Sequence, residues 1–511
     1  MAAANRKREA KQSQRENFVD IKVKTKEVLQ DRKKINHLID LQAYIENEEA
    51  PVVVAGIKSL DKIFCHFLQK GYLCAVTGES DSQKQVREWS LERHTEFKER
   101  LSSLISSDQV QVQEQALISM MHLLQAEGQN PVVKVEGKKS AFPMAILETL
   151  IGQMLNLQTG AAAAVLTRFQ EFVEYDDVLF HLLRVLGIIL KAKKDVDEKF
   201  LLNLICLLEH VTMHDNSSEK EDSKQKLFCL SEAQFHWSYP QAKKFFSIIW
   251  QQVLKCRLTV SVYKRVLILL PDKVLPHLER PLLLTDFLME SYSVGGAISV
   301  LALHGVFLLM QNYNLEYPEF YAKLYALLDP SVIFVKYRAR FFYLLDLFMS
   351  STHVPEYIAA AFIKRLSRLA LIAPPNVIVL LLHFIGNLMI RHRGLSRLTH
   401  NPLDQNDMEK DPYVMEEANL AACRAVDSSL WEIKSLQMHV LPEVANSAKF
   451  IDRDMPKTEW DISQDLELTM EDMLEKETKR KSPDDVPLNF EKPAKFACVK
   501  NEKLSQYFVL N

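Results

Sequence analysis

The stretch DQVQVQEQALISMMHLLQAEG, residues 108–128, decides the fold class. Its apolar side chains recur at about every third or fourth position, at Val112, Leu117, Met120, Met121 and Leu124. That spacing places them on one face of an α-helix. The sequence GQNPVVKVEGKK, which follows, breaks the pattern with glycine, asparagine and proline. A helix closed by a polar joint is therefore predicted here.

The same alternation of helix and short joint continues on both sides of this stretch. Amphipathic segments follow at about 144–157, 163–173, 177–192 and 197–213, and the second half restarts near Ser231 and stays densely helical to about Arg393. Glycine is scarce, with 13 residues in 511, which favours helices over tight hairpins. No strict repeat motif is present. The sequence therefore predicts an all-α fold, an armadillo/HEAT-like helical solenoid of divergent pairs.

Composition shifts along the chain predict its organisation. Residues 1–34 hold 11 Lys or Arg against 5 acids, the stretch DNSSEKEDSKQK lacks periodicity, and residues 404–475 hold 18 acids against 6 bases. The predicted parts are a mobile basic head at 1–25, a helical repeat region at 26–214, a flexible linker at 215–228, a helical core at 229–400, an acidic helical extension at 401–475 and a polar tail at 476–511.

The overall composition indicates an ordinary folded intracellular protein. Hydrophobic residues make up 48% and charged residues 25%, and the net charge of −3 argues against a simple polyanion binder. The seven cysteines are scattered, with no C-x-x-C, which indicates a reduced protein without a disulfide framework. The first residues contain no apolar run of the kind that a secretory signal needs.

Enzyme and cofactor motifs are absent from the sequence. There is no P-loop, dinucleotide-binding, HExxH or G-x-S-x-G motif. Cys206, His210 and His214 fall on one helical stripe, but eight residues of helix span about 12 Å, too far for one metal ion. We therefore expect no enzyme, no catalytic residue, no cofactor and no metal site.

Two apolar runs approach the length of a membrane span. Residues 294–310 and 371–390 contain no formal charge. His304 and His383 lie within them, and Pro374 and Pro375 interrupt the second. The run between them carries several charges, each costing about 2.5–3.5 kcal/mol at a bilayer centre. We favour buried helices of a large helical protein over membrane spans.

Clustered cations are the main candidate interaction feature. Residues 357–403 contain six Lys or Arg and no acid, and three further cations lie just upstream. A single-sign cluster indicates an anionic partner, RNA phosphate or an acidic protein segment. Pairing with the chain's own acidic residues at 404–475 remains an equal alternative. The candidate contacts are Lys336, Arg338, Arg340, Lys364, Arg365, Arg368, Arg391, Arg393 and Arg397.

The same region resembles the CCAAT-binding-factor (CBF) domain family. The residues that carry the resemblance lie in EYPEFYAKLYALLDPSVIFVKYRARFFYLLDLFMSSTHVPEYIAAAFIKRLSRLALIAPP. They are the Y-P-x-F-Y-x-K-L-Y opening, the K-x-x-x-R-F-F block, the S-x-H-x-P turn and F-I-K-R-L-S-R-L-A-L. Downstream, DPYVMEEANLAACRAVDSSLWEIKSLQMHVLPEV resembles the nucleolar complex protein 4 branch, with its S-S-L-W-E, L-Q-x-H and P-x-V elements. The resemblance covers about 295–450, and residues 1–290 match only in helical character.

The resemblance implies a non-enzymatic factor of the nucleus and nucleolus that works in small ribosomal subunit biogenesis. Members are α-helical, and this branch is expected to pair with nucleolar protein 14 in a heterodimer. That heterodimer would support 18S rRNA maturation and pre-40S assembly and export, among other early pre-40S and small-subunit processome proteins. Contacts with pre-rRNA would go through its backbone or be indirect, since no RNA-reading module is present.

Residues near the end of the resemblance are candidates for partner docking or for the core. In SSLWEIKSLQMHVLP, Leu430, Ile433, Leu436 and Val440 form an apolar stripe at helical spacing. Trp431 and Met438, seven apart, share another face, for which we favour a buried position, and Pro442 is expected to end the helix. The candidate anchors are Tyr413, Trp431, His439 and Pro442.

Two other functions remain open. One is a multi-pass membrane protein of the nuclear envelope that uses 294–310 and 371–390. The other is a CCAAT-type DNA-binding transcription factor, which the absence of a helix-turn-helix, zinc or basic-zipper signature disfavours. For the scaffold hypothesis, charge reversal of Arg365 and Arg368 is expected to weaken association with a particle without unfolding the chain.

Overall fold

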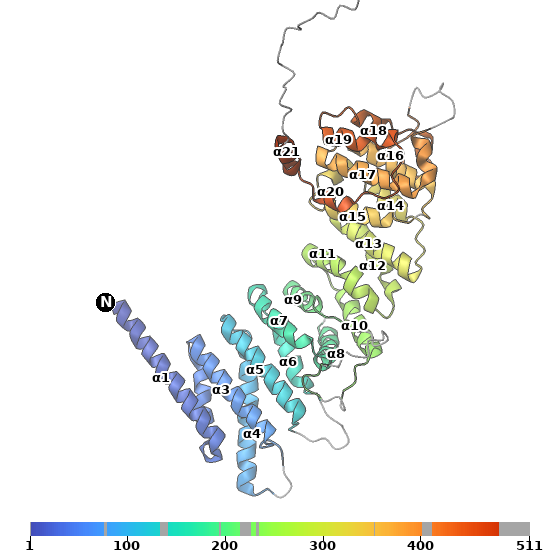
Figure 1. The fold of residues 1–511 in the computed structure, drawn as a ribbon. Helices are drawn as coiled ribbons and strands as arrows, with labels where there is room; N and C mark the ends of the chain where they lie inside the picture. The colour runs from blue at the N-terminus through green and yellow to red at the C-terminus, as the bar shows by residue number, and fades with distance from the viewer. Residues whose placement is uncertain are drawn as a thin grey trace, which may run out of the picture. The chain divides into compact units, whose positions relative to one another are not determined.

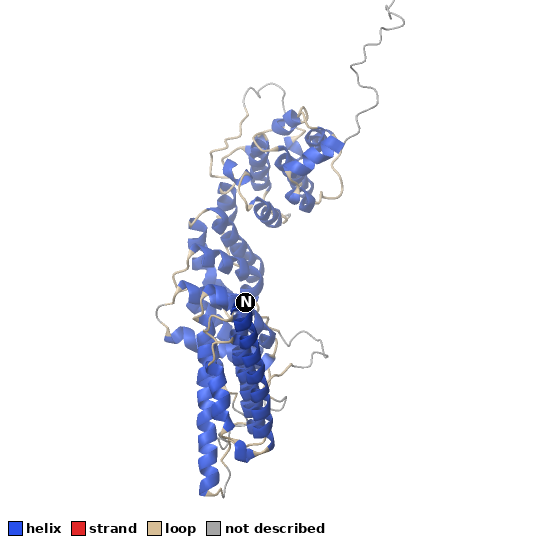
Figure 2. Cartoon of the chain, turned by 90° about the vertical axis from the view of Figure 1, so that its left-hand side faces the viewer, coloured by secondary structure: helices blue, strands red, loops and turns tan. Residues whose placement is uncertain are grey.

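Helices are the regular elements of the structure wherever it is described. The computed structural model describes residues 2–75, 79–132, 142–193, 196–214, 226–230, 235–351, 353–400 and 411–479, and no strand occurs in them (Figure 2). The predicted all-α class is confirmed. Contacts divide the chain into two compact units, Met1–Tyr317 and Pro318–Asn511. The sequence placed its main break at 215–228 instead, of which 215–225 lie outside the described residues.

The first unit contains thirteen described α-helices. They are α1 (Ala2–Gln30), α2 (His37–Ala43), α3 (Ala50–Gln69), α4 (Asp81–Leu104), α5 (Val110–Gln129), α6 (Met144–Leu155), α7 (Thr159–Val173), α8 (Asp176–Ala192), α9 (Glu198–Leu208), α10 (Tyr239–Val253), α11 (Val260–Leu269), α12 (Thr285–Ser293) and α13 (Gly296–Tyr313). The four segments predicted between 144 and 213 correspond to α6–α9, with α9 ending five residues early.

The helices of the first unit pack in two layers. Along one layer α1, α3, α5, α7, α9, α11 and α13 each contact the next, and along the other α6 contacts α8 and α8 contacts α10 (Figure 1). Contact between every second helix is the pattern of stacked antiparallel pairs, which defines an α-solenoid. The apolar stripe predicted for 108–128 is the buried face of α5, where Leu117, Met121 and Leu124 are fully enclosed.

The basic N-terminal segment is helical where a mobile head was predicted. Helix α1 runs from Ala2 to Gln30 and packs against α3. Ile21, Thr25 and Val28 share one face at i, i+4 and i+7, and all three are buried. Those three positions supply a buried face that the prediction of a mobile head at 1–25 did not include.

The second unit is built around a helical hairpin. Its α-helices are α14 (Phe320–Ala326), α15 (Arg338–Phe348), α16 (Glu356–Ala370), α17 (Pro375–Arg391), α18 (Trp431–Leu436), α19 (Pro442–Ser447), α20 (Ile462–Glu467) and α21 (Met470–Lys479). Helices α16 and α17 pack against each other, and α18–α21 lie around them. Two short 3-10 turns also matter below, η7 (Arg393–Leu398) and η9 (Ala448–Asp452).

The two apolar runs form α13 and α17. Helix α17 is enclosed by its own unit, and Leu381, Leu382 and Phe384 are fully buried. By length and composition alone α13 is the one helix of the described residues that could cross a membrane, and half of it is buried in the fold. A core helix of a large protein passes the same test.

Candidate anionic-partner interface

Two of the candidate cations lie in a buried charge cluster, which consists of Lys364, Arg368, Asp411 and Glu432. Lys364 Nζ lies 2.6 Å from Glu432 Oε1 and 3.2 Å from Asp411 Oδ2. Arg368, one turn later on α16, lies 2.7 Å from Asp411 Oδ2 and 2.8 Å from Glu432 Oε1. Lys364 and Glu432 are fully buried, so these cations face their own chain rather than an external anion.

Asp411 is the most heavily hydrogen-bonded member of the cluster. Burial alone would raise the pKa of Asp411, but hydrogen bonds from Ser428, Trp431 and the Tyr413 amide, and the charge of Lys364, lower it far below its usual range. Burial raises the pKa of Glu432, against the opposing effect of Lys364. One carboxylate is thus held ionised by donors, while the other depends on its cations to stay charged.

Arg365 is also satisfied inside the unit. Its guanidinium donates to the carbonyl oxygens of Leu328 at 2.6 Å and Met415 at 2.8 Å. It also lies 4.5 Å from the centre of the Tyr325 ring, whose hydroxyl hydrogen-bonds the Tyr413 hydroxyl at 2.7 Å. This side chain therefore ties α14 and the segment after residue 411 to α16.

Arg391, the last residue of α17, bridges two distant segments. It lies 2.8 Å from Asp346 Oδ1 on α15 and 2.6 Å from Glu459 Oε2. Burial alone would lower the pKa of Arg391, but Glu459 and Asp346 raise it. Of the two alternatives left open by the sequence, internal pairing with the acidic region describes Lys364, Arg368 and Arg391.

The other five candidate cations have no carboxylate partner among the described residues. Arg338 is half-buried and donates to the Ile333 carbonyl at 3.3 Å, and burial lowers its pKa. The other four are exposed, two beside the start of α15 and two on η7: Lys336, Arg340, Arg393 and Arg397. These four remain proposals for contact with an anionic partner.

The candidate anchors divide between core and surface. Tyr413 is buried, and its hydroxyl bonds to Tyr325. Trp431 is 39% exposed, donates to Asp411 Oδ2 at 2.9 Å and lies 4.7 Å from the Arg368 guanidinium. His439 is half-buried and Pro442 is exposed. Trp431 therefore covers the buried charge cluster with one face while its other side meets solvent.

The helix predicted through residues 430–441 is much shorter in the structure. Helix α18 ends at Leu436, and Met438 and His439 close a tight turn onto Ser435 and Leu436. Leu430, Ile433 and Leu436 are buried as predicted, but Val440 is 93% and Met438 is 89% exposed. The buried position favoured for Trp431 and Met438 is wrong, because the turn removes Met438 from the helix. Pro442 begins α19 rather than ending α18.

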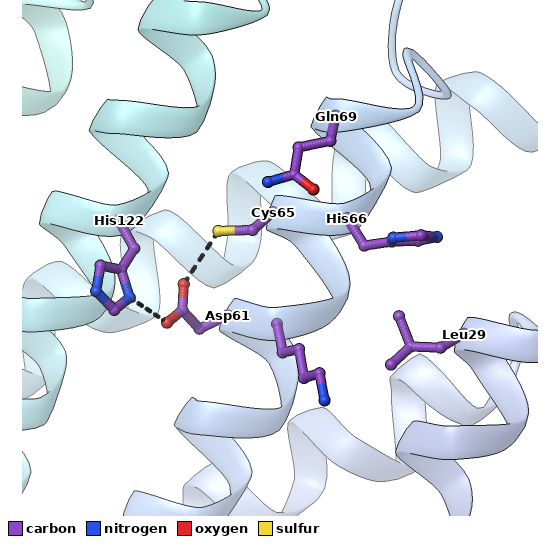
Figure 3. Close-up of a pocket in the computed structure, with 7 residues that line it drawn as sticks. Leu29, Asp61, Cys65, His66, Gln69 and His122 are labelled. Atoms are coloured by element: carbon purple, nitrogen blue, oxygen red, sulfur yellow. Dashed lines mark hydrogen bonds and ion pairs between the residues drawn. The ribbon is translucent and has the colours of Figure 1, made fainter. Parts of the chain in front are cut away.

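A pocket of about 440 Å³ in the first unit brings together a cysteine, an aspartate and a histidine (Figure 3). Asp61 lies between the other two: His122 Nδ1 is 2.8 Å from Oδ2, and Cys65 Sγ donates to Oδ1 at 3.3 Å. Burial and the Asp61 charge raise the pKa of the Cys65 thiol. A nucleophile or metal ligand must be a thiolate, so this arrangement links α3 to α5 without activating the sulfur.

The histidines after α9 do not form a metal site in the described part of the chain. His210 Nδ1 lies 2.8 Å from Gln170 Nε2 and 3.0 Å from the Cys206 carbonyl oxygen, while Arg265 contacts the Cys206 sulfur at 3.4 Å. No group of three His, Cys, Asp or Glu suited to a metal ion occurs among the described residues.

Two family models match parts of the chain, one in each half. The CBF/Mak21 family model matches residues 299–448, and the model described as nucleolar complex protein 4-like, TPR repeats, matches 11–195. The second match covers residues 11–195, which resembled the family in the sequence only by their helical character. The helical repeats that its description names agree with the solenoid.

Relatives match the chain over almost its whole length. The nucleolar complex protein 4 homolog of Gallus gallus is 36% identical over 505 residues, covering 95% of this chain and 98% of the relative. Homolog B of Xenopus laevis is 37% identical over 509 residues (96% and 95%), and the Homo sapiens homolog is 34% identical over 503 residues (95% and 96%). The chain therefore belongs to the nucleolar complex protein 4 family, a nucleolar family with a role in ribosome biogenesis.

Proposed function

We propose that this chain is a non-catalytic helical scaffold in small ribosomal subunit biogenesis, acting as a heterodimer with nucleolar protein 14. In this role the heterodimer supports 18S rRNA maturation and the assembly and export of pre-40S particles. The observation that carries the proposal is the family match, which spans both units. The two-layer helical stack adds physical support, since such a stack offers long surfaces for other proteins.

The charge distribution supports protein docking over extensive RNA binding. Lys364, Arg365, Arg368 and Arg391 are engaged inside the second unit, which leaves four exposed cations of the nine candidates. Since few of the candidate cations are free, we favour contacts with the pre-rRNA backbone that accompany protein docking rather than drive it.

The surface turn after α18 is the proposed place for docking of the protein partner. Met438 and Val440 are almost fully exposed and follow Trp431 closely in the sequence. Tryptophan is a residue type enriched at the energetic centres of protein interfaces. The exposure of Met438 and Val440 costs free energy in water that a partner's apolar surface would recover. We propose that Met438 and Val440 form the docking surface. The sequence gave Tyr413, Trp431, His439 and Pro442 as candidates for docking or for the core.

Affinity purification of the tagged full-length chain at low salt tests the proposal. Nucleolar protein 14 should co-purify in equal amount, and the chain should sediment with large particles that contain 18S rRNA precursors. Purification without nucleolar protein 14, or sedimentation of the chain only as a small species, would overturn it.

The same preparation tests the two other candidate functions. Carbonate extraction leaves an integral membrane protein in the pellet, so release of the chain argues against the use of α13 as a span. DNase treatment releases a chromatin-bound factor, whereas the scaffold stays with the sedimenting particles.

A further inference from the structure

The second unit contains a basic pocket, a hollow of about 540 Å³ beside the end of α17. Its floor is apolar, formed by Met389, Ile390 and Ile451. Three exposed cations line its edge, Arg393 from η7 and Arg453 and Lys457 from the segment after η9. The volume falls within the range of about 300–1,000 Å³ typical of ligand-binding pockets.

Among the described residues, the two acids that flank the pocket's cations in the sequence, Asp452 and Glu459, are paired elsewhere. Asp452, beside Arg453, lies 2.7 Å from Lys434 and accepts from Gln437 at 2.9 Å. Glu459, just beyond Lys457, pairs with Arg391. Of the described acids only Asp454 lines the pocket, against three cations. The local excess of positive charge is therefore a property of how the acids are distributed.

The pocket wall is held in place before any ligand arrives. Trp460 follows the segment that carries Arg453 and Lys457, and its backbone exchanges two hydrogen bonds with the Asn387 side chain, at 2.8 and 2.9 Å. Its ring stacks on His383 of α17, with centres 5.7 Å apart and an angle of 6° between planes. A preformed site loses less conformational entropy on binding.

The chemistry of the lining favours a peptide over RNA. His400 is the one aromatic ring among the described lining residues and no Phe, Tyr or Trp is present, whereas proteins that hold single-stranded bases stack successive bases on several such rings. Methionine and isoleucine instead accommodate an apolar side chain, and methionine adapts its shape to it. Cations around an apolar floor are complementary to an apolar anchor flanked by carboxylates.

We infer that the basic pocket binds an acidic peptide segment of a partner protein, with one apolar side chain on the floor and acidic neighbours at Arg393, Arg453 and Lys457. The inference rests on the proposed scaffold role only in requiring a protein partner. It does not require that partner to be nucleolar protein 14, and the site lies on residues other than Met438 and Val440.

Photo-crosslinking at Ser396, an exposed residue of the pocket lining, tests this inference. The full-length chain carries p-benzoylphenylalanine at Ser396 and is irradiated in cells, and mass spectrometry identifies the crosslinked residue. Ala421, exposed in the segment before α18 and outside the pocket, is the matched control position. The expected adduct at Ser396, absent at Ala421, is a protein segment with at least two acids close to an apolar residue.

Charge reversal completes the experiment. Arg453→Glu with Lys457→Glu should lower the adduct yield about tenfold, because two surface ion pairs with the acidic segment are lost and reversal adds repulsion. Lys255→Glu with Arg257→Glu, exposed cations of the first unit that have no role in either docking proposal, should leave the yield unchanged.

Five results would overturn the inference. They are no adduct at Ser396, an adduct with RNA, an adduct with this chain's own residues or a second copy, equal yields at Ser396 and Ala421, and a yield that survives reversal of Arg453 and Lys457. Co-sedimentation of the reversed variant with 18S precursors separates the two proposals. Suppose that the reversed variant still co-sediments with 18S precursors, and that the chain without these substitutions forms no adduct at Ser396. The pocket assignment then fails and the scaffold role stands.

Discussion

Lys364 Nζ lies 2.6 Å from Glu432 Oε1, and both side chains are fully buried in the second unit. The pair joins α16 to the start of α18, and Arg368 and Asp411 complete the cluster. Desolvation of two charges offsets much of their attraction, so such a pair adds little net stability. Its consequence is specificity: any other arrangement of residues 411–436 on α16 would leave a charge buried without a partner.

Lys364→Met should destabilise the second unit by about 3–5 kcal/mol, because Glu432 would remain buried without its closest cation. Hydrogen exchange of α16 in the full-length chain measures the loss as faster exchange confined to the second unit. Lys434→Met is the matched control, since the Lys434–Asp452 pair is exposed to solvent, which screens it, and should contribute little to stability. Equal effects of the two substitutions would contradict the role given to burial.

Charge reversal of Arg365 and Arg368 now has a different expected outcome from the one that the sequence suggested. Arg365 donates to two carbonyl groups and Arg368 contacts Asp411 and Glu432, so glutamates here would face acceptors and acids. We expect loss of the fold of the second unit rather than a folded chain that associates weakly. Circular dichroism and hydrogen exchange distinguish the two results.

His94 should make the first unit sensitive to acid. Its ring is fully buried on α4 against Phe64, and burial lowers its pKa to about 3. In the unfolded chain this histidine has its ordinary pKa of 6.5 and takes up a proton as the pH falls below that value, while in the folded chain it stays neutral. The contribution of His94 to the free energy of unfolding is therefore fully present above about pH 6.5. It falls as the pH drops, by up to about 2 kcal/mol at about pH 5.

Urea unfolding of the first unit at about pH 7.5 and about pH 5 measures this dependence. His94→Gln should reduce the difference between the two midpoints. His122→Gln is the contrast: its hydrogen bond to Asp61 raises the pKa of His122, so this residue stabilises the fold at low pH and loses that effect as the pH rises. Replacing His122 should therefore make the free energy of unfolding fall more steeply as the pH drops. A His94→Gln variant with the pH dependence of the unsubstituted chain would contradict the assignment.

Much of the helical architecture follows from periodicity, and its exceptions have local causes. The stripe at 108–128 and the segments that became α6–α8 are amphipathic over several turns, and packing agreed with the pattern. The prediction that an apolar stripe runs through Val440 is wrong because α18 is only six residues long. Periodicity over so few turns does not establish that a helix continues, and a turn closed onto Leu436 ended it.

Sequence analysis identified the clustered cations but not the acidic residues that pair with them. Counting acids in 404–475 identified the region that neutralises α16 and α17 without selecting Asp411, Glu432 or Glu459. Those contacts join residues 43–68 apart in the chain, and a side-chain pair at that separation depends on tertiary packing. Arg453 and Lys457 were missed as candidates because they lie in an acidic stretch whose acids pair elsewhere.

Gly386→Ala should displace Trp460 from α17. A Cβ atom at Gly386 would overlap the Trp460 ring, with Cε3 and Cη2 both at 3.1 Å. Since the indole is rigid and held by Asn387, we expect a loss of about 1–3 kcal/mol of stability, as in other overpacked cores. Trp460 fluorescence and hydrogen exchange of 453–460 measure it. Gly187→Ala, on a helix of the first unit with open space around the added Cβ, should be neutral or stabilising.

The four exposed cations predict how RNA contact responds to salt. If Lys336 and Arg340 each contact a phosphate, Lys336→Gln with Arg340→Gln should make the slope of log affinity against log salt shallower by about 1.4, which is two contacts at about 0.7 each for single strands. Filter binding of the full-length chain to a pre-rRNA fragment measures the slope. The substitutions should leave the unfolding midpoint unchanged, since both side chains are exposed without a carboxylate partner among the described residues. An unchanged slope would contradict direct contact at these cations, and the association of this chain with rRNA would then depend on its protein partners.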